Sequence, residues 1–282
     1  MIQSIAIIGT GLIGGSFGLA LKKRGFTGRI IGCDRGAILE QAHSVGAIDV
    51  ARTNPVEAIL GSQVVLLATP VGSIIEMLRN LGPATAGDVL FTDVGSTKAE
   101  IVAQARHTFG SNHDYRFLPG HPMAGKEHSG IEFADPDLFR GALWYFTPNV
   151  DREPSPLARE FAGLVGSLGA RIATIDPAEH DRLCAWISHL PQMLSTALAA
   201  SLVEEFGSDP QLFESGGRAL GEMTRIAGSP YSMWRDIALT NQENLSEALL
   251  KLEQKLAHIR ENLNTRELEA EFDQAHKLRN TE

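Results

Sequence analysis

The feature that most constrains the fold is the run Gly9-Thr10-Gly11-Leu12-Ile13-Gly14, which follows the apolar segment Ile5–Ile8 and opens a helical pattern. In a strand–turn–helix unit, the first glycine makes a tight turn and the second lets the backbone approach a pyrophosphate. The third lets the helix pack closely on the strand, and the helix N-terminus offers N–H groups to phosphates. The run predicts a dinucleotide site that includes Gly9, Gly11, Leu12, Ile13 and Gly14.

The first half of the chain alternates short apolar runs with helical or turn-rich segments. Runs rich in Ile, Val and Leu are typical of parallel strands that are buried on both faces. The strand candidates are Ile5–Ile8, Arg29–Cys33, Val64–Ala68, Val89–Thr92, Arg116–Leu118, Ala142–Thr147 and Ala170–Ile175. A helix at Pro154–Leu168 is expected to connect the last two. We therefore predict a Rossmann-type, doubly wound α/β domain over residues 1–174.

After Asp176 the strand patterns give way to amphipathic helices. Leucines recur at helical spacing from Leu194 onward, and Leu245–Leu263 continues the pattern with Glu, Lys and Gln between the apolar positions. Asp176 and Pro177 form a typical helix start. We predict an all-α domain over residues 175–282 and a ligand cleft between the two domains. The apolar surface of these helices exceeds what one small domain would bury, so we also expect a homodimer.

The choice of dinucleotide depends on the end of the second predicted strand. Asp34 lies there, about 20 residues after Gly14, where a carboxylate accepts hydrogen bonds from a ribose 2′-hydroxyl and repels a 2′-phosphate. This favours NAD, although the neighbouring Arg35 leaves NADP open as an alternative. Thr69 and Pro70 follow the next strand and should reach the same carboxyl edge of the sheet, where ligands bind.

A histidine is expected at the same edge. His121 precedes Pro122, which biases it out of helical conformations, and histidine is a proton acceptor near neutral pH. Gly95 and Ser96 follow the strand Val89–Thr92. We expect the Ser96 hydroxyl to cap the next helix, to hydrogen-bond His121 or a ligand, or to do both. An imidazole base beside a nicotinamide is the minimum equipment for oxidising an alcohol.

Composition excludes several other functions. The net charge is −9 and no basic run occurs, so neither nucleic acid nor a membrane surface is an expected partner. The sequence has no apolar run of the roughly 20 residues that span a bilayer, and no basic leader or cleavage site is apparent at its start. Cys33 and Cys184 are far apart, so no disulfide framework is expected and a cytoplasmic location is predicted. We predict no metal site.

The chain resembles the prephenate/arogenate (cyclohexadienyl) dehydrogenases of tyrosine biosynthesis. The resemblance covers nearly the whole length and both predicted domains. The first of the matching segments is generic, and the other five are specific in combination. They are Gly9–Ser16, Asp93–Lys98, His121–Gly125, Ser188–Gln192, Thr224–Ala227 and Met233–Asp236.

The resemblance implies an NAD-linked oxidative decarboxylation that yields 4-hydroxyphenylpyruvate and makes the substrate ring aromatic. His121 falls on the catalytic histidine of the family, Ser96 on the serine that positions it, and Arg225 on the arginine that holds a substrate carboxylate. An arginine fork also matches a carboxylate on physical grounds. The same resemblance places further substrate contacts at Ser188, His189, Gln192 and Gly125.

Some positions of the helical half leave choices open. His189 is expected to face the cleft, although a structural histidine is an equally good interpretation. Gln192 stands where many prephenate-handling relatives have histidine, which keeps arogenate, or both substrates, as alternatives. Glu127 and Glu222 are expected to pair with cations near the mouth of the site or to lie on the surface. Trp234 is expected in the core rather than against a ligand.

Two other functions are compatible with a dinucleotide-binding domain. A β-hydroxyacid dehydrogenase would have a similar two-domain plan, but such enzymes usually depend on a lysine that neither Ser188–Gln192 nor Thr224–Ala227 provides. A non-catalytic NAD-binding regulator would give no reason for His121, Ser96 and Arg225 to occur together. Both remain as weaker alternatives.

Overall fold

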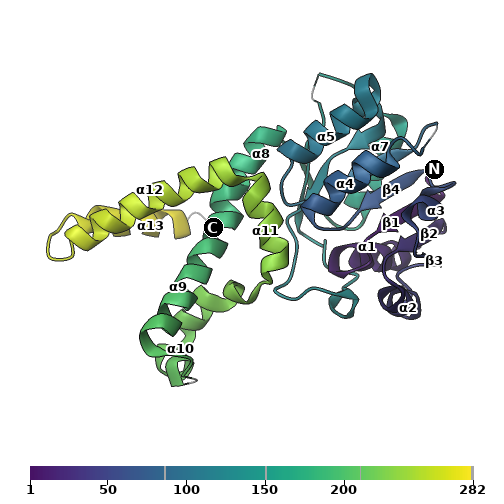
Figure 1. Cartoon of the computed structure of the whole chain (residues 1–282). Coiled ribbons are helices and arrows are strands. Elements are labelled where there is room, and N and C mark those ends of the chain that lie inside the picture. The colour runs from purple at the N-terminus through teal and green to yellow at the C-terminus, as the bar shows by residue number, and fades with distance from the viewer. Residues whose placement is uncertain (86, 150, 210, 281–282) are drawn as a thin grey trace.

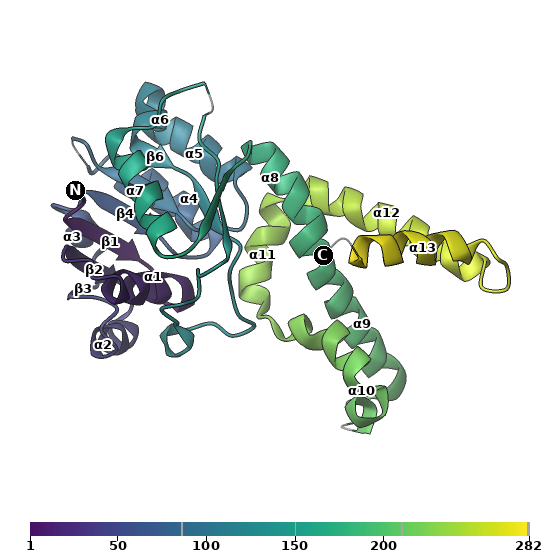
Figure 2. The same cartoon turned by 180° about the vertical axis from the view of Figure 1, so that it is seen from behind.

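The two halves of the chain fold into different architectures. The computed structural model describes residues 1–85, 87–149, 151–209 and 211–280. An α/β unit contains the N-terminus, and the helices that follow residue 176 extend away from it in two arms (Figure 1). The view from behind shows α9 and α10 in one arm and α12 and α13 in the other (Figure 2).

The α/β unit is built on a six-stranded parallel sheet. Its strand order is β3-β2-β1-β4-β5-β6, the arrangement in which dinucleotides bind where the strand order reverses. Helices cover both faces of the sheet, and two hydrophobic clusters fill the space beneath them. The elements are β1 (Ser4–Ile8), α1 (Leu12–Lys23), β2 (Arg29–Cys33), α2 (Gly36–Ser44), β3 (Val50–Arg52), α3 (Pro55–Ile59), β4 (Val64–Leu67), α4 (Val71–Leu81), β5 (Leu90–Asp93), α5 (Ala99–Phe109), α6 (His113–Arg116) and β6 (Phe117–Leu118).

A second sheet corrects one sequence expectation. The predicted strands at 142–147 and 170–175 do not extend the main sheet; as β8 (Leu143–Phe146) and β9 (Arg171–Thr174), they join β7 (Gly120–Pro122) in a three-stranded sheet. The helix α7 (Pro156–Ser167) connects β8 to β9, as expected, and those two strands are parallel. Neither β3 nor β7, each of three residues, was predicted.

The helical half begins at a capped helix. The Asp176 side chain accepts hydrogen bonds from the amides of Ala178 and Glu179, which confirms the predicted start. The elements are α8 (Pro177–Cys184), a π-helical turn η3 (Ala185–His189), α9 (Leu190–Phe206), α10 (Gln211–Thr224), a 3₁₀ turn η4 (Arg225–Gly228), α11 (Tyr231–Thr240), α12 (Gln242–Glu261) and α13 (Leu268–Arg279). Among the described residues, no helix has the length and hydropathy needed to cross a bilayer.

Candidate active site

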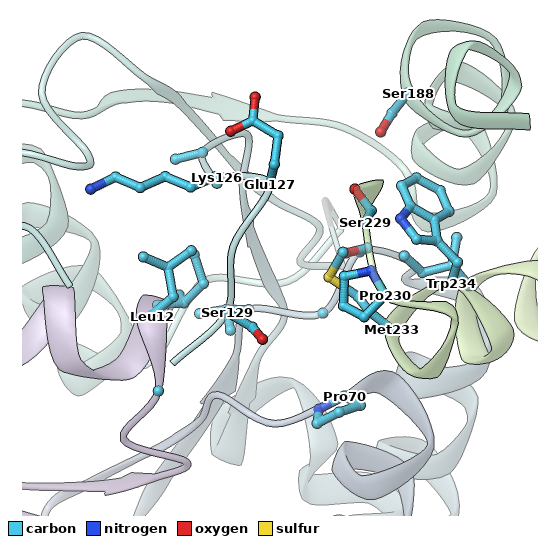
Figure 3. A pocket seen from close by; sticks show the side chains of 18 of the residues that line it. Leu12, Pro70, Lys126, Glu127, Ser129, Ser188, Ser229, Pro230, Met233 and Trp234 are labelled. Carbon is cyan, nitrogen blue, oxygen red and sulfur yellow. The ribbon is translucent and has the colours of Figure 1, made fainter. Parts of the chain in front are cut away.

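A cavity of about 810 Å³ lies between the α/β unit and the helical half. This volume is within the usual range for small-molecule and cofactor sites. Leu12 and Pro70 border it from the α/β side, and Ser188 and Trp234 border it from the helices (Figure 3). Trp234, which was expected in the core, is half-buried at this wall. Of the predicted site residues, the following line the cavity: Gly11, Leu12, Ile13, Arg35, Thr69, Pro70, Gly95, Ser96, His121, Gly125, Ser188, Gln192 and Arg225.

The three motif glycines occupy three different environments. Gly9 has φ +95°, a conformation that side chains rarely adopt, and Gly14 is packed so closely that a Cβ there would overlap the carbonyl oxygen of Gly9. A Cβ on Gly11 would meet no protein atom within 4 Å, and this residue lines the cavity. The first and third glycines therefore satisfy the packing of the protein, whereas the second leaves space for a ligand.

Asp34 joins the glycine turn to the end of β2. One carboxylate oxygen accepts the Thr10 amide at 2.8 Å, and the other accepts the Arg35 amide at 2.8 Å. Beside this carboxylate is a smaller cavity of about 390 Å³, which Gly9, Asp34, Arg35 and Thr69 help to line. It has room for the adenosine end of a dinucleotide whose phosphates face the N-terminus of α1.

A buried ion pair holds the strand that carries His121. Lys98 and Asp93 are both fully buried and bonded to one another. The Lys98 ammonium also donates to the Gly120 carbonyl at 2.6 Å, while Asp93 accepts the Gly120 amide at 3.1 Å. Because Lys98 and Asp93 both form hydrogen bonds with the backbone of Gly120, they fix the position of β7 relative to β5.

His121 lies inside β7 and borders the cavity. Its Nδ1 is 2.9 Å from Nε2 of His180, a histidine of α8, so Nε2 is the ring nitrogen left for the cavity. Burial, followed by electrostatic repulsion from His180, Lys98 and His189, holds the pKa of His121 well below its usual value. A neutral imidazole is the form that accepts a proton.

Asp181 contributes the cap that was expected from Ser96. The helix α5 begins at Ala99, with Lys98 as its N-cap residue. The Asp181 carboxylate accepts the amides of Lys98, at 2.7 Å, and Ala99, at 2.9 Å. The capping prediction for Ser96 is therefore wrong, because the helix starts too late for its hydroxyl to reach the first turn. Ser96 borders the cavity, and among the described residues no hydrogen bond joins it to His121.

Arg225 pairs with Glu127 at the cavity wall. Arg225 begins the turn η4, Glu127 lies in the loop after β7, and both line the cavity. The arginine side chain is 63% exposed, so solvent weakens this pair. An incoming carboxylate would compete with Glu127 for the guanidinium. Glu222, the other predicted acidic partner, lies exposed on α10.

Gln192 is buried at the same wall. Its amide nitrogen donates to the Ile226 carbonyl at 2.9 Å and to the Thr196 hydroxyl at 3.2 Å. The contact to Ile226 connects α9 to η4, the turn that carries Arg225. Because the Ile226 carbonyl can only accept, the orientation of the amide is fixed, and its oxygen is the group that Gln192 has left for a ligand.

His189 does not line the cavity, contrary to the expectation that it faces the cleft. Its side chain is buried, Nδ1 accepts from Asn241 at 3.1 Å, and the ring packs edge-on against Trp234. The Nε2 atom has no partner among the described residues. Burial lowers the pKa of His189 to about 4.

The histidine cluster also has the composition of a metal site. Ligand atoms of His121, His180 and Cys184 lie within 4.8 Å of one another. However, the facing nitrogens of the two histidines already form a hydrogen bond, and the Cys184 sulfur is 3.4 Å from the same His180 nitrogen. The arrangement is that of a hydrogen-bonded network.

Comparisons with known proteins agree with this architecture. Residues 17–174 match the model for the prephenate dehydrogenase nucleotide-binding domain, and residues 176–277 match the model for the prephenate dehydrogenase dimerization domain. The chain belongs to the prephenate dehydrogenase family. The resemblance inferred from the sequence motifs is therefore confirmed.

Three members of this family show how far the similarity extends. A prephenate dehydrogenase of Lactococcus lactis is 31% identical over 98% of this chain and 77% of its own length. The solved prephenate dehydrogenase of Aquifex aeolicus, in complex with hydroxyphenyl propionate and NAD+, is 31% identical with a TM-score of 0.87, covering 100% of this chain and 98% of that one. The Synechocystis arogenate dehydrogenase is 28% identical with a TM-score of 0.77, over 98% and 99%.

Sequence reasoning missed the residues that support His121. Lys98 occurs in the sequence only as the last residue of the segment Asp93–Lys98, and His180 and Asp181 belong to none of the matching segments. One signal was available, because His180 and Asp181 follow the predicted helix start at Asp176 by only four and five residues. Their position places them in the first turns of a helix that begins at the domain junction.

Proposed function

We propose that the chain oxidises and decarboxylates prephenate to 4-hydroxyphenylpyruvate, with NAD as the hydride acceptor. The observation that carries the proposal is one cavity bordered by the glycine turn, by a neutral buried histidine and by an arginine. The family membership of the chain supports the same reaction. The same membership argues against the two alternatives, a β-hydroxyacid dehydrogenase and a non-catalytic regulator.

Each side chain has a distinct part in the proposed chemistry. NAD, when bound, would supply the acceptor for the hydride that leaves the ring carbon carrying the hydroxyl. His121 Nε2 takes the hydroxyl proton, and Ser96, at the same wall, positions that hydroxyl. Arg225 binds a substrate carboxylate by displacing Glu127 from its guanidinium. Loss of the ring carboxylate as carbon dioxide then leaves an aromatic ring, which makes the reaction effectively irreversible.

We further propose that NAD is preferred over NADP. The Asp34 carboxylate stands beside the smaller cavity, where a ribose 2′-hydroxyl can donate to it and a 2′-phosphate would be repelled. Arg35 lines the same cavity with its side chain exposed, so it does not cancel the fixed carboxylate. Its charge is screened by solvent.

Gln192 favours a second candidate substrate. The side chain of arogenate carries an ammonium group where prephenate carries a keto group. Because the amide nitrogen of Gln192 is committed to Ile226, the available amide oxygen is an acceptor, which suits an ammonium donor. We therefore keep arogenate as the alternative substrate, with tyrosine as its product.

The helical half is proposed to form a homodimer. Its part of the chain matches a domain described as a dimerization domain. Large apolar side chains are exposed along its helices, including Phe206 at 62%, Leu239 at 64% and Phe272 at 74%. These side chains are candidates for the interface with a second copy of the chain. A monomer mass measured by light scattering would contradict the dimer. We propose that this domain starts at residue 175, so that the domain boundary lies between residues 174 and 175.

The activity is tested with four combinations of substrate and cofactor. Prephenate or arogenate is mixed with the protein and either NAD or NADP, and the absorbance of the reduced nicotinamide is followed. We expect the highest kcat/KM with prephenate and NAD. A higher value with arogenate would select the alternative substrate, and no signal in any combination would refute the enzymatic proposal.

A further inference from the structure

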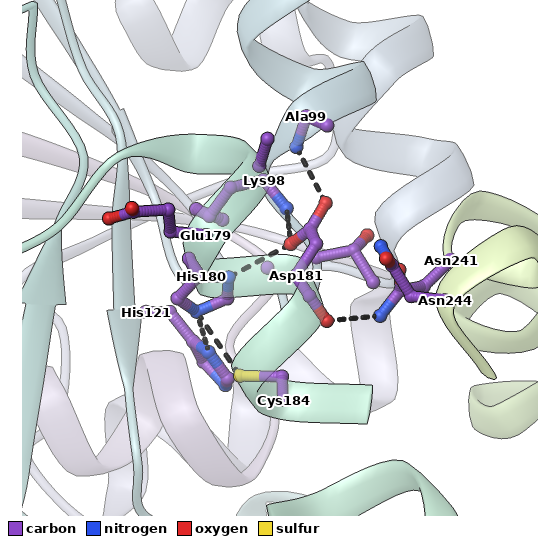
Figure 4. Close-up of polar contacts among 12 residues, drawn as sticks. Lys98, Ala99, His121, Glu179, His180, Asp181, Cys184, Asn241 and Asn244 are labelled. Carbon is purple, nitrogen blue, oxygen red and sulfur yellow. Dashed lines mark hydrogen bonds and ion pairs between the residues drawn. The ribbon is translucent and has the colours of Figure 1, made fainter. Parts of the chain in front are cut away.

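A continuous chain of hydrogen bonds runs from the helix α5 to His121. Asp181 accepts the amides of Lys98 and Ala99 and is 2.8 Å from Nδ1 of His180; Nε2 of His180 is 2.9 Å from Nδ1 of His121 (Figure 4). The three side chains that form this network, Asp181, His180 and His121, are buried. His180 and Asp181 are shielded from bulk water, and His121 reaches the cavity only at the end of the network.

The chemistry of Asp181 decides where the proton of His180 sits. The Asp181 oxygen that faces His180 already accepts the backbone N–H of Lys98, so it acts as an acceptor toward the ring as well. Nδ1 of His180 must then carry a proton and donate it. In a neutral imidazole only one nitrogen is protonated, so Nε2 of His180 is an acceptor.

Cys184 supports the same assignment. Its sulfur is 3.4 Å from Nε2 of His180, and burial raises the pKa of the thiol to about 12. A thiol that stays protonated can donate weakly to Nε2 but cannot accept strongly from it. Both neighbours of that nitrogen, Cys184 and His121, are therefore placed to donate.

We propose that His180, oriented by Asp181, is a positioning residue that holds the proton of His121 on Nδ1 and leaves Nε2 free as the base. This inference rests on the proposed function, in which His121 takes the substrate hydroxyl proton. When His121 becomes charged, its Nδ1–H still faces an acceptor, so the geometry is kept through the reaction. The Asp181 carboxylate, at the other end of the hydrogen-bond network, stabilises the positive charge on His121.

The arrangement joins the two halves of the molecule. His121 belongs to β7 of the α/β unit, whereas His180 and Asp181 belong to α8, the first helix of the helical half. The same Asp181 carboxylate caps α5 of the α/β unit, and its backbone carbonyl accepts from Asn241 on the far side. Docking of α8 on α5 and selection of the His121 tautomer therefore depend on one carboxylate.

The proton position can be observed without measuring activity. Nitrogen NMR spectra of histidine-labelled protein distinguish a protonated ring nitrogen from an unprotonated one, and the His121 signals are identified by their loss in His121→Asn. We expect Nδ1 protonated and Nε2 unprotonated in the wild-type protein. A proton on Nε2 would overturn the inference, whatever the outcome of the activity assays.

Two substitutions of His180 separate its contacts. The oxygen of glutamine reaches the position of Nε2 and can accept from His121, whereas asparagine reaches only the position of Nδ1 and keeps the side facing Asp181. We expect His180→Gln to keep most of the turnover and His180→Asn to lower kcat about 10- to 100-fold, the effect of one lost hydrogen bond of roughly 1.4–3 kcal/mol. KM and the Kd for NAD should change less than about twofold in both variants. On the same scale, such a change is well under 1 kcal/mol.

The pair also distinguishes positioning from simple packing. In His180→Asn, the NMR signals of His121 should show a mixture of tautomers, and in His180→Gln they should match the wild type. Equal kcat in the two variants would overturn the inference, and so would a loss of kcat in His180→Asn with His121 signals unchanged. If His121→Asn itself kept full turnover, the proposed function of His121 would fail while the tautomer assignment remained.

Discussion

The cofactor side and the catalytic side of the cavity are built in opposite ways. The glycine turn consists of consecutive residues, and its recognition groups are backbone N–H groups and empty space above Gly11. The support of His121 comes from side chains of β5, of the N-cap residue before α5 and of α8, which are as far apart in sequence as Asp93 and Asp181. A phosphate needs a surface of fixed shape, whereas a base needs a defined proton position. The first is provided by local backbone geometry and the second by tertiary contacts.

The comparison predicts its largest effect at His121. His121→Asn removes the base but leaves the glycine turn untouched, so kcat should fall roughly 10²- to 10⁴-fold while NAD binds as before. Steady-state kinetics and a cofactor titration measure the two quantities. A parallel loss of NAD affinity would show that the two sides are not separable.

Arg225 sharpens the comparison on the substrate side. Arg225→Ala removes a charge-assisted contact to a carboxylate, so KM should rise about 10- to 100-fold, corresponding to roughly 1.4–3 kcal/mol. Glu127→Gln is the matched control, because it breaks the same ion pair without removing the cation. It should leave KM unchanged or lower it. A loss of kcat in Arg225→Ala at constant KM would contradict a binding role.

Two glycine substitutions test whether the cofactor side depends on shape. Gly14→Ala places a Cβ against the Gly9 carbonyl and should lower the melting temperature, because neither backbone segment has room to move. Gly11→Ala meets no protein atom, so stability should be kept and the Kd for NAD should rise about tenfold, or roughly 1.4 kcal/mol. If Gly11→Ala bound NAD normally, a ligand would not occupy the space above this residue.

The last expected effect is on stability at low pH and does not involve the ligands. His189 has a pKa near 4 in the folded chain and about 6.5 when unfolded, so the unfolded chain binds more protons between these values. The contribution of neutral His189 to stability should therefore be fully present above pH 6.5 and should be lost as the pH drops toward 4. His189→Asn keeps an acceptor for Asn241 and should flatten the dependence of melting temperature on pH. An unchanged slope would contradict the burial of a neutral His189.

The sequence predicted the parts of the site that depend on neighbouring residues. The strand–glycine–helix pattern, the helix start at Asp176 and the family motifs all follow from local spacing. Two expectations failed for a common reason. α5 starts too late for Ser96 to cap it, and Asp181, from another part of the chain, provides the cap; His189 turns toward Asn241 instead of the cavity. Both outcomes depend on which remote side chain competes for the same group.

The second sheet was beyond sequence reasoning for a related reason. An apolar run predicts a strand but does not state its partner, and β8 and β9 pair with the short strand β7 rather than with the main sheet. This pairing orients His121 within β7 beside α8. The site therefore depends on a strand of only three residues, too short to show any periodicity.

The sequence by itself determined the dinucleotide fold, the family and the identity of His121 as the candidate base, because each depends on residues adjacent along the chain. Only the tertiary structure decided how that histidine is held, since hydrogen bonds to Nδ1 depend on positions fixed by the docking of α8 against α5. Local spacing constrains backbone conformation over a few residues. The proton position of a buried imidazole is set by groups that folding brings together from distant parts of the chain.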